Sequence, residues 1–260
     1  MVIFNKVYFI FFLFILFSCA ANKNNEITIS QVDFNEALDK YNNGKYSVSR
    51  DEFLSIIYNN PLSEHANDSQ FYVAECEYNL KNYKQAILEY LKYLRSPYQR
   101  VPFVKKSELI LCRCYYQLSL EYNKDQSGTY LAIEKLQYYL EKENLKEHSD
   151  EIENMISNLR NKLAKKDYET AKMYIRIKEY KAAEIYFLNI VNEYYDTDFF
   201  DISVFNVSLI KSIKNKKSGQ FFLEENRDAF IDKDDYLEAQ SILDNLNENE
   251  KVDYYIDLIK

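Results

Sequence analysis

Glycine, proline and histidine are scarce in this chain of 260 residues, which has three Gly, three Pro and two His. Sheets of short strands need many turn residues, so this scarcity favours long helices joined by polar loops. Three isolated glycines cannot form a loop that cradles a phosphate group. His65 and His148 belong to no zinc-protease motif, and the chain has no GxSxG motif for a nucleophilic serine. The sequence therefore predicts no catalytic site, no metal site and no cofactor.

Apolar residues, in contrast, are plentiful. Hydrophobic residues make up 47% of the chain and aromatic residues 16%. This is enough to bury a sizeable core, in one elongated domain or two compact ones, and it argues against disorder of the whole chain.

The amino terminus has the pattern of a secretory signal. Lys6 supplies positive charge, and residues 7–17 form an apolar run that is too short to span a bilayer, which takes ~20 residues. The run leads into Leu16-Phe17-Ser18-Cys19, which resembles the lipobox of bacterial lipoproteins, where the chain is cut before a cysteine that receives lipid. We expect residues 1–18 to be a signal peptide, Cys19 the lipid attachment site and residues 19–29 a tether. The alternative is an ordinary secreted protein in which Cys19 has no special role.

A pattern of apolar and small residues returns along the chain. Tyr46, Ser49, Phe53 and Ile57 lie three or four residues apart, which places them on one face of a helix that Pro61 ends. The pattern returns at Tyr83, Ala86, Tyr90 and Leu94, and again at Tyr180, Ala183, Phe187 and Val191. A second small residue lies twelve positions before each small residue of the pattern, in the pairs Ala37 and Ser49, Ala74 and Ala86, and Ala171 and Ala183.

Small residues twelve positions apart can lie on facing helices and let them approach closely. This arrangement resembles the tetratricopeptide repeat, a helix–turn–helix unit of about 34 residues. The pairs Ala37 and Ser49, Ala74 and Ala86, and Ala171 and Ala183 mark the first, second and fourth units. The third unit has its first helix around residues 111–118, an enlarged loop at 121–130 and its second helix around Ala132. A fifth, weaker unit pairs a first helix at 202–213 with a second around Ala239, separated by a long insert around Gly219.

A single helical hairpin cannot bury its own apolar face, so such hairpins must stack to form a stable body. We therefore predict an all-α protein, a right-handed α-solenoid of about five tetratricopeptide-like hairpins. The solenoid is expected to occupy residues 30–260, with a divergent last repeat from about 202 to 260.

If Cys19 carries lipid, three cysteines remain: Cys76, Cys112 and Cys114. An odd number argues against a disulfide framework in an oxidising compartment, so we favour simple core packing for all three. One bridge between Cys76 and Cys114, which occupy equivalent positions of neighbouring repeats, stays an open alternative. Equivalent positions of stacked helices usually lie too far apart for that bond.

Several motifs occur in a characteristic order and spacing. After the lipobox, the first unit carries Tyr41, Gly44, Tyr46 and Pro61-Leu62-Ser63, and the enlarged loop reads Asp125-Gln126-Ser127-Gly128-Thr129. Further on stand Leu159-Arg160-Asn161-Lys162-Leu163-Ala164, leading into Tyr168 and Ala171, and then Tyr194-Tyr195-Asp196-Thr197. Together these features resemble the BamD family of outer-membrane protein assembly lipoproteins. The resemblance runs from about Cys19 to Phe205, and the chain departs from the pattern from Ser208 onward.

The resemblance implies a periplasmic α-solenoid that a lipid on Cys19 holds to the inner face of the outer membrane. Members of that family are not enzymes. They bind a barrel-forming assembly protein, act with other assembly lipoproteins, and help insert unfolded β-barrel clients. The alternative is a repeat lipoprotein that organises another envelope process, such as peptidoglycan synthesis or secretion.

In tetratricopeptide repeats, the fifth and twelfth positions of the first helix tend to face a groove that holds partners. Here the side chains at these positions are large and mostly aromatic, which suits an extended apolar and aromatic peptide. The alternative is that they fill gaps between repeats, because core positions recur as regularly as groove positions. The candidates are Phe34, Tyr41, Phe71, Tyr78, Leu109, Tyr116 and Tyr168, with Ile175 at the last such position.

Negative charge is concentrated at the carboxyl end. Without the signal peptide the chain has 32 basic and 41 acidic residues, and residues 222–260 hold twelve of the acidic residues but only four basic ones. Such an end repels nucleic acid and anionic lipid and favours a basic patch on a partner protein. A solvated acidic tail without a partner is the alternative. We expect no nucleic-acid binding, because the sequence has no basic stripe.

Overall fold

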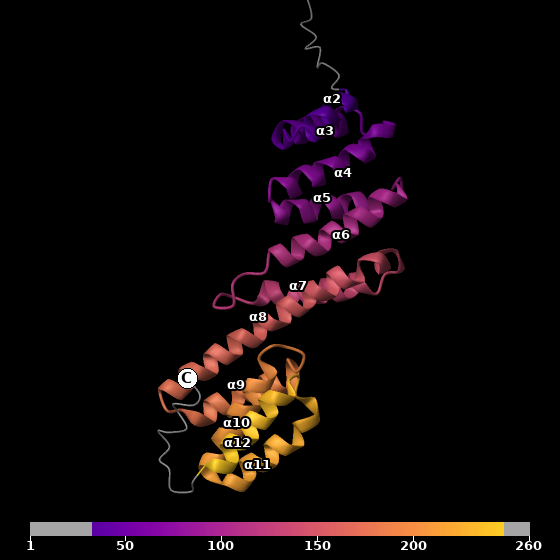
Figure 1. The fold of residues 1–260 in the computed structure, drawn as a ribbon. Helices are drawn as coiled ribbons and strands as arrows, with labels where there is room; N and C mark the ends of the chain where they lie inside the picture. The colour runs from indigo at the N-terminus through magenta and orange to yellow at the C-terminus, as the bar shows by residue number, and fades with distance from the viewer. Residues whose placement is uncertain (1–32, 247–260) are drawn as a thin grey trace, which may run out of the picture.

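The computed structural model describes residues 33–246 and shows them as a long stack of helices (Figure 1). No strand occurs within this range, which confirms the predicted all-α solenoid. The predicted signal peptide, Cys19 and the tether lie outside the described residues, as does the chain after Leu246. The α-helices are α2 (Phe34–Asn42), α3 (Tyr46–Asn59), α4 (Glu64–Asn79), α5 (Tyr83–Arg95), α6 (Val101–Gln117), α7 (Ser127–Leu140), α8 (Ser149–Arg176), α9 (Tyr180–Glu193), α10 (Phe200–Lys214), α11 (Lys216–Glu225) and α12 (Lys233–Asn245), with short 3-10 turns at Glu143–His148 and Arg227–Ala229.

Three of the hairpins turn in the same way. The residue two positions before the second helix has a positive φ: 74° at Gly44, 62° at Lys81 and 64° at Lys178. Each of these residues donates its backbone N–H to a carbonyl in the last turn of the first helix, at 2.9 Å. This is the left-handed end that commonly closes a helix, and it usually favours glycine because a Cβ is strained there.

The small residues twelve positions apart bring the two helices of a hairpin together. Ser49 on α3 donates its hydroxyl to the carbonyl of Ala37 on α2 at 2.8 Å, and both residues are fully buried. The other pairs, Ala74 with Ala86 and Ala171 with Ala183, are also fully buried. The twelve-residue spacing therefore predicted core positions correctly in all three hairpins.

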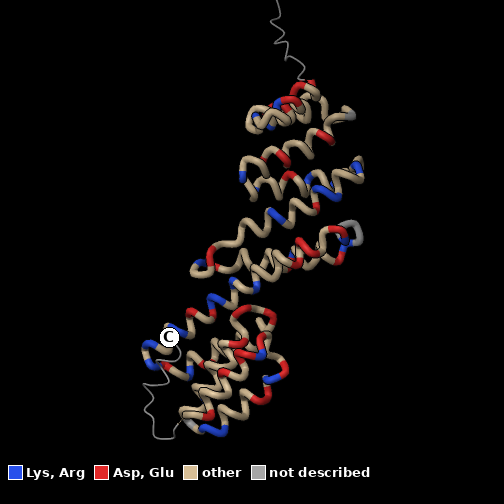
Figure 2. The backbone as a smooth tube through the Cα atoms, viewed as in Figure 1, with Lys and Arg blue, Asp and Glu red and all other residues tan. Residues whose placement is uncertain are grey.

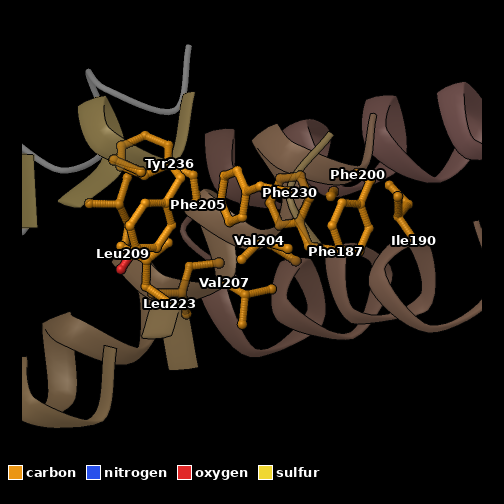
Figure 3. Packing of buried hydrophobic residues seen from close by; sticks show 14 of the residues in the cluster. Phe187, Ile190, Phe200, Val204, Phe205, Val207, Leu209, Leu223, Phe230 and Tyr236 are labelled. Atoms are coloured by element: carbon orange, nitrogen blue, oxygen red, sulfur yellow. The ribbon is translucent and has the colours of Figure 1, made fainter. Parts of the chain in front are cut away.

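The core consists of three clusters along the stack, one for α2–α4, one for α4–α8 and one for α8–α12. Tyr72 packs against both of the first two clusters, and Ile133 packs against both of the last two. The last cluster holds many large apolar side chains, including Phe187, Phe200 and Phe230 (Figure 3). Each hairpin thus buries its apolar face against the next one, as stacked repeats do.

The carboxyl-terminal unit differs from the predicted one. Its first helix, α10, forms at the expected place, but the insert around Gly219 is itself a helix, α11, and this helix packs directly against α10. A Cβ added at Gly219 would lie 1.9 Å from the Ser212 hydroxyl and 2.3 Å from the Ser208 carbonyl oxygen, so the two helices are in close contact there. The helix that carries Ala239, α12, packs against both α10 and α11. The unit is therefore a three-helix end and not a hairpin with a long loop.

The longest helix of residues 33–246, α8, has 28 residues and passes from the third unit into the fourth (Figure 1). Neither α8 nor any other helix between residues 33 and 246 is long and apolar enough to cross a membrane.

Candidate peptide-binding surface

The structure divides the predicted groove residues into two groups. Phe71 and Leu109 belong to the core, with 1% and 7% of their surface exposed, and Ile175 is buried as well. The Phe71 ring stacks on Phe103 with a centroid distance of 4.2 Å. For these positions the structure supports the gap-filling alternative, because a peptide cannot reach side chains that neighbouring helices already cover.

The other candidates keep part of their surface exposed. Tyr41, Tyr78 and Tyr116 lie at corresponding positions of α2, α4 and α6, and we call these three residues the tyrosine row. Each packs one side against the core. Phe34 and Tyr168 are partly buried in the same manner.

The first member of the tyrosine row is held by a buried carboxylate. The Tyr41 hydroxyl donates to Glu75 on α4 at 2.7 Å, and Glu75 also accepts from Tyr90 at 2.7 Å and from Lys106 at 2.8 Å. Glu75 is 2% exposed, so all of its partners satisfy a charge that would otherwise be costly to bury. Burial and the Glu75 charge raise the pKa of Tyr41 far above its usual value, so its hydroxyl stays protonated and keeps donating.

The second member has a charged neighbour in the equivalent position. Arg113 of α6 aligns with Glu75 of α4 in the repeat, and its guanidinium lies beside Tyr78. Burial raises the pKa of Tyr78, and the positive charge of Arg113 opposes that rise. Arg113 is itself fixed by Glu151 on α8, since Nε donates to a carboxylate oxygen at 2.7 Å. A charged neighbour of the tyrosine thus recurs in the next repeat, with the opposite sign.

Rings that are fixed in place lose little entropy when they bind, so the tyrosine row suits contact with apolar and aromatic side chains of an extended peptide. Among residues 33–246 no group of three or more His, Cys, Asp or Glu could hold a metal ion.

A second group of polar residues joins two loops to α8. Lys162 donates to the Ser119 hydroxyl at 2.8 Å in the loop between α6 and α7, while Asn161 accepts from the backbone N–H of Asp198 at 2.9 Å. Arg160 donates from Nε to both carboxylate oxygens of Asp196, at 2.9 and 2.8 Å. We call these three consecutive α8 residues and their partners the α8 junction, because they connect the third unit to the loop between α9 and α10.

The enlarged third loop is ordered by a buried amide. Gln126, 4% exposed, donates to the carbonyls of Glu121 at 2.7 Å and Lys124 at 3.0 Å, and accepts from the Thr129 hydroxyl at 2.8 Å. Thr129 lies 2.7 Å from the Ser119 hydroxyl to which Lys162 donates. The loop is therefore bound to α8 through one continuous chain of hydrogen bonds.

A family model described as an outer membrane lipoprotein, YfiO, matches residues 27–206. The chain belongs to the YfiO family of outer membrane lipoproteins. This is the family that also carries the name BamD, so the resemblance found in the sequence is confirmed at the level of the family. A search of curated proteins gave no match. The YfiO match covers the tyrosine row and the α8 junction, and it ends within α10.

The α8 junction was missed as a site in the sequence, although its residues carried the resemblance to the YfiO family. The three motifs at 125–129, 159–164 and 194–197 meet at this one place. The sequence shows only the order of these motifs along the chain. The one signal for the site is the run of three polar residues, Arg160 to Lys162, within an amphipathic helix.

The three cysteines of the described chain are unpaired and buried. Burial raises the pKa of each thiol to about 12. The structure thus agrees with core packing and contains no bridge between Cys76 and Cys114.

Proposed function

We propose that this YfiO-family lipoprotein is a non-catalytic scaffold of the outer-membrane β-barrel assembly machinery. In this proposal the amino-terminal repeats hold unfolded β-barrel clients, and the carboxyl-terminal repeats dock the barrel-forming assembly protein and other assembly lipoproteins. A lipid on Cys19 holds the scaffold at the periplasmic face of the outer membrane.

The observation that carries the proposal is the YfiO match over residues 27–206, because this range includes the repeats that present the tyrosine row. The structure supports a scaffold in two further ways. The tyrosine row offers partly exposed rings on three successive units, and the α8 junction ties the repeats that would bind clients to the repeats that would dock the partner.

The mechanism is binding without chemistry. A client segment in extended form places alternate side chains on one side, and these side chains contact rings on successive units. Contact at several units adds up, so an unfolded segment binds better than a folded barrel that exposes few such side chains together. Release follows when the client pairs its strands in the membrane and the segment is no longer available.

The test is to purify the tagged protein from gently solubilised envelopes and to identify the proteins that accompany it. We expect a barrel-forming assembly protein among them. Recovery of peptidoglycan enzymes without any barrel-assembly protein would overturn the proposal in favour of another envelope process.

The anchor has its own test. We expect the protein to incorporate radiolabelled fatty acid and the Cys19→Ala variant to incorporate none. Incorporation that persists in Cys19→Ala would show that Cys19 is not the attachment site.

A further inference from the structure

A pocket of about 290 Å³ opens between α10 and α12 in the three-helix end. Most of the lining residues lie beyond residue 206, where the YfiO match ends, so this pocket depends on a part of the chain outside the family pattern. The lining residues are Asp201, Ile202 and Phe205 from α10, Phe230 from the preceding loop, and Asp235, Glu238, Ala239 and Ile242 from α12.

The inner walls of the pocket are apolar and closely packed. Phe205 and Phe230 are nearly buried, at 9% and 8% exposed, and belong to the last core cluster (Figure 3). The Phe230 ring packs against Phe200 and Tyr236, with centroid distances of 6.5 and 5.4 Å. Ile202 is 37% exposed, so the apolar wall continues to the surface. The volume lies near the lower end for small-ligand pockets, which suits one or two large apolar side chains.

The rim of the pocket is negative. The Asp201 carboxylate accepts from the backbone N–H groups of Ile231 and Asp232 at 2.9 and 2.8 Å. It therefore holds in place the loop that leads into α12. Asp235 and Glu238 are exposed and have no ion-pair partner among residues 33–246. Asp234 also lies on the first turn of α12, and Figure 2 draws the acidic residues of this helix in red among uncharged positions in tan. The rim therefore favours a cationic group beside the apolar walls.

We propose that this pocket binds a basic segment of a partner protein, with an apolar side chain between Phe205 and Phe230 and a flanking Lys or Arg paired with Asp235 and Glu238. The proposal rests on the proposed function, since it gives the chemistry of the partner that the carboxyl-terminal repeats dock. Charge complementarity selects this occupant. The chain's own segment 247–260 contains four acidic and two basic residues, so the rim repels it.

The test uses the full chain in detergent and a fluorescent peptide of alternating Lys with Leu and Phe, with a peptide of Glu in place of Lys as its control. We expect the Lys peptide to bind, to weaken as salt is added, and to bind better than the Glu peptide. The Asp235→Asn/Glu238→Gln variant should weaken the Lys peptide by about tenfold, the effect of two partly exposed charge pairs. These side chains are exposed, so the variant should unfold at the same temperature as the wild type.

The matched control is Glu225→Gln/Asp228→Asn, which removes the same charge from exposed positions outside the pocket. Its affinity for the Lys peptide should change by less than about twofold. Equal losses in the two double variants would show unspecific charge attraction and overturn the proposal.

Two other occupants have distinct outcomes, and either would overturn the proposal. If the full chain fails to bind the peptide but binds it after deletion of residues 247–260, the chain's own end fills the pocket. If the chain forms dimers that Asp235→Asn/Glu238→Gln dissociates, a second copy fills it. The peptide assay contains no assembly protein, so failure of the Lys peptide to bind would not contradict the scaffold proposal. Conversely, if the tagged protein is recovered without any barrel-assembly protein, the measured peptide affinity still stands.

Discussion

The Tyr41 hydroxyl on α2 donates to the Glu75 carboxylate on α4 at 2.7 Å, so one member of the tyrosine row also joins two repeats. Its ring is available to a client only on the side that the core leaves exposed. The Tyr41 ring can contact a peptide, while the Tyr41 hydroxyl makes the contact between the two repeats. Replacing Tyr41 by Phe removes only the hydroxyl, and replacing it by Ala removes the ring as well, so the two roles can be separated.

Peptide capture should depend on the rings of the tyrosine row. We expect Tyr41→Ala/Tyr78→Ala to weaken binding of an extended peptide that ends in an aromatic residue, because aromatic contacts contribute about 0.5–1.5 kcal/mol each. The Tyr41→Phe/Tyr78→Phe variant keeps the rings and should keep most of that affinity. Fluorescence anisotropy measures the affinity, and circular dichroism checks that helicity is retained.

The control for this pair is Tyr58→Ala/Tyr98→Ala, which removes two rings that are 78% and 80% exposed and lie outside the tyrosine row. It should leave peptide affinity unchanged. Loss of folding in Tyr41→Ala/Tyr78→Ala would show that the two rings act as core residues, and an equal loss of affinity in the control would show that binding is not localised.

The contact between α10 and α11 should tolerate no side chain at Gly219. We expect Gly219→Ala to lower the free energy of unfolding by about 1–3 kcal/mol, because the new Cβ meets the Ser208 backbone carbonyl and one of the helices has to move. Urea unfolding followed by circular dichroism measures the change. Gly128→Ala serves as the control, since its Cβ would have only one neighbour, at 3.4 Å. A neutral Gly219→Ala would contradict the close packing of these helices.

The buried thiols should be inert in the native protein. With a pKa of about 12, each of Cys76, Cys112 and Cys114 is thiolate to roughly one part in ten thousand at pH 8, and the thiolate is the reactive form. N-ethylmaleimide should therefore label none of them until urea unfolds the chain, as mass spectrometry of peptides would show. A disulfide-linked pair of peptides containing Cys76 and Cys114 would contradict the structure.

The α8 junction should stabilise the protein in a pH-dependent manner. Burial raises the pKa of Asp196, but the hydrogen bonds and the positive charge of Arg160 outweigh burial and hold that pKa below its usual value. A lowered folded-state pKa adds stability that is present above the usual aspartate pKa of about 3.9 and is lost as the pH falls through the lowered value. We expect Arg160→Met to lower the free energy of unfolding at neutral pH by about 0.5–1 kcal/mol, since the pair is partly exposed.

The measurement is urea unfolding of the wild type and Arg160→Met, at neutral pH and near pH 3. The difference between the two proteins should begin to shrink as the pH falls below the usual aspartate pKa of about 3.9, because the unfolded chain then binds a proton at Asp196 more readily than the folded protein does. Arg176→Met, at the end of the same helix and exposed, should show no such pH dependence. A difference that stays constant from neutral pH to acid would mean that Arg160 acts through its bond to the Glu193 carbonyl and not through Asp196.

The repeats could be predicted because their physical requirements are local. A close approach of two helices needs small residues at fixed spacing, and Ala37 with Ser49 met that requirement twelve positions apart. The end of α3 could be predicted in the same way, since the helix stops at Asn59, just before Pro61.

Other features depend on contacts that the sequence does not display. Helix α11 was missed because its residues lack the Tyr and Ala spacing and because Gly219 disfavours a helix, a cost that only the approach of α10 explains. Phe71 and Tyr78 recur with equal regularity, yet one is core and the other is partly exposed. The bond of Arg160 to Asp196 links residues 36 positions apart and needed the fold to be seen.

The proposed role of this protein in β-barrel assembly is tested most directly by the β-barrel content of the outer membrane when the protein is depleted. We expect folded, heat-modifiable barrel proteins to decline, unfolded clients to accumulate in the periplasm, and the wild-type gene to restore both. Normal barrel content during depletion, with a defect in the cell wall or in secretion instead, would contradict it.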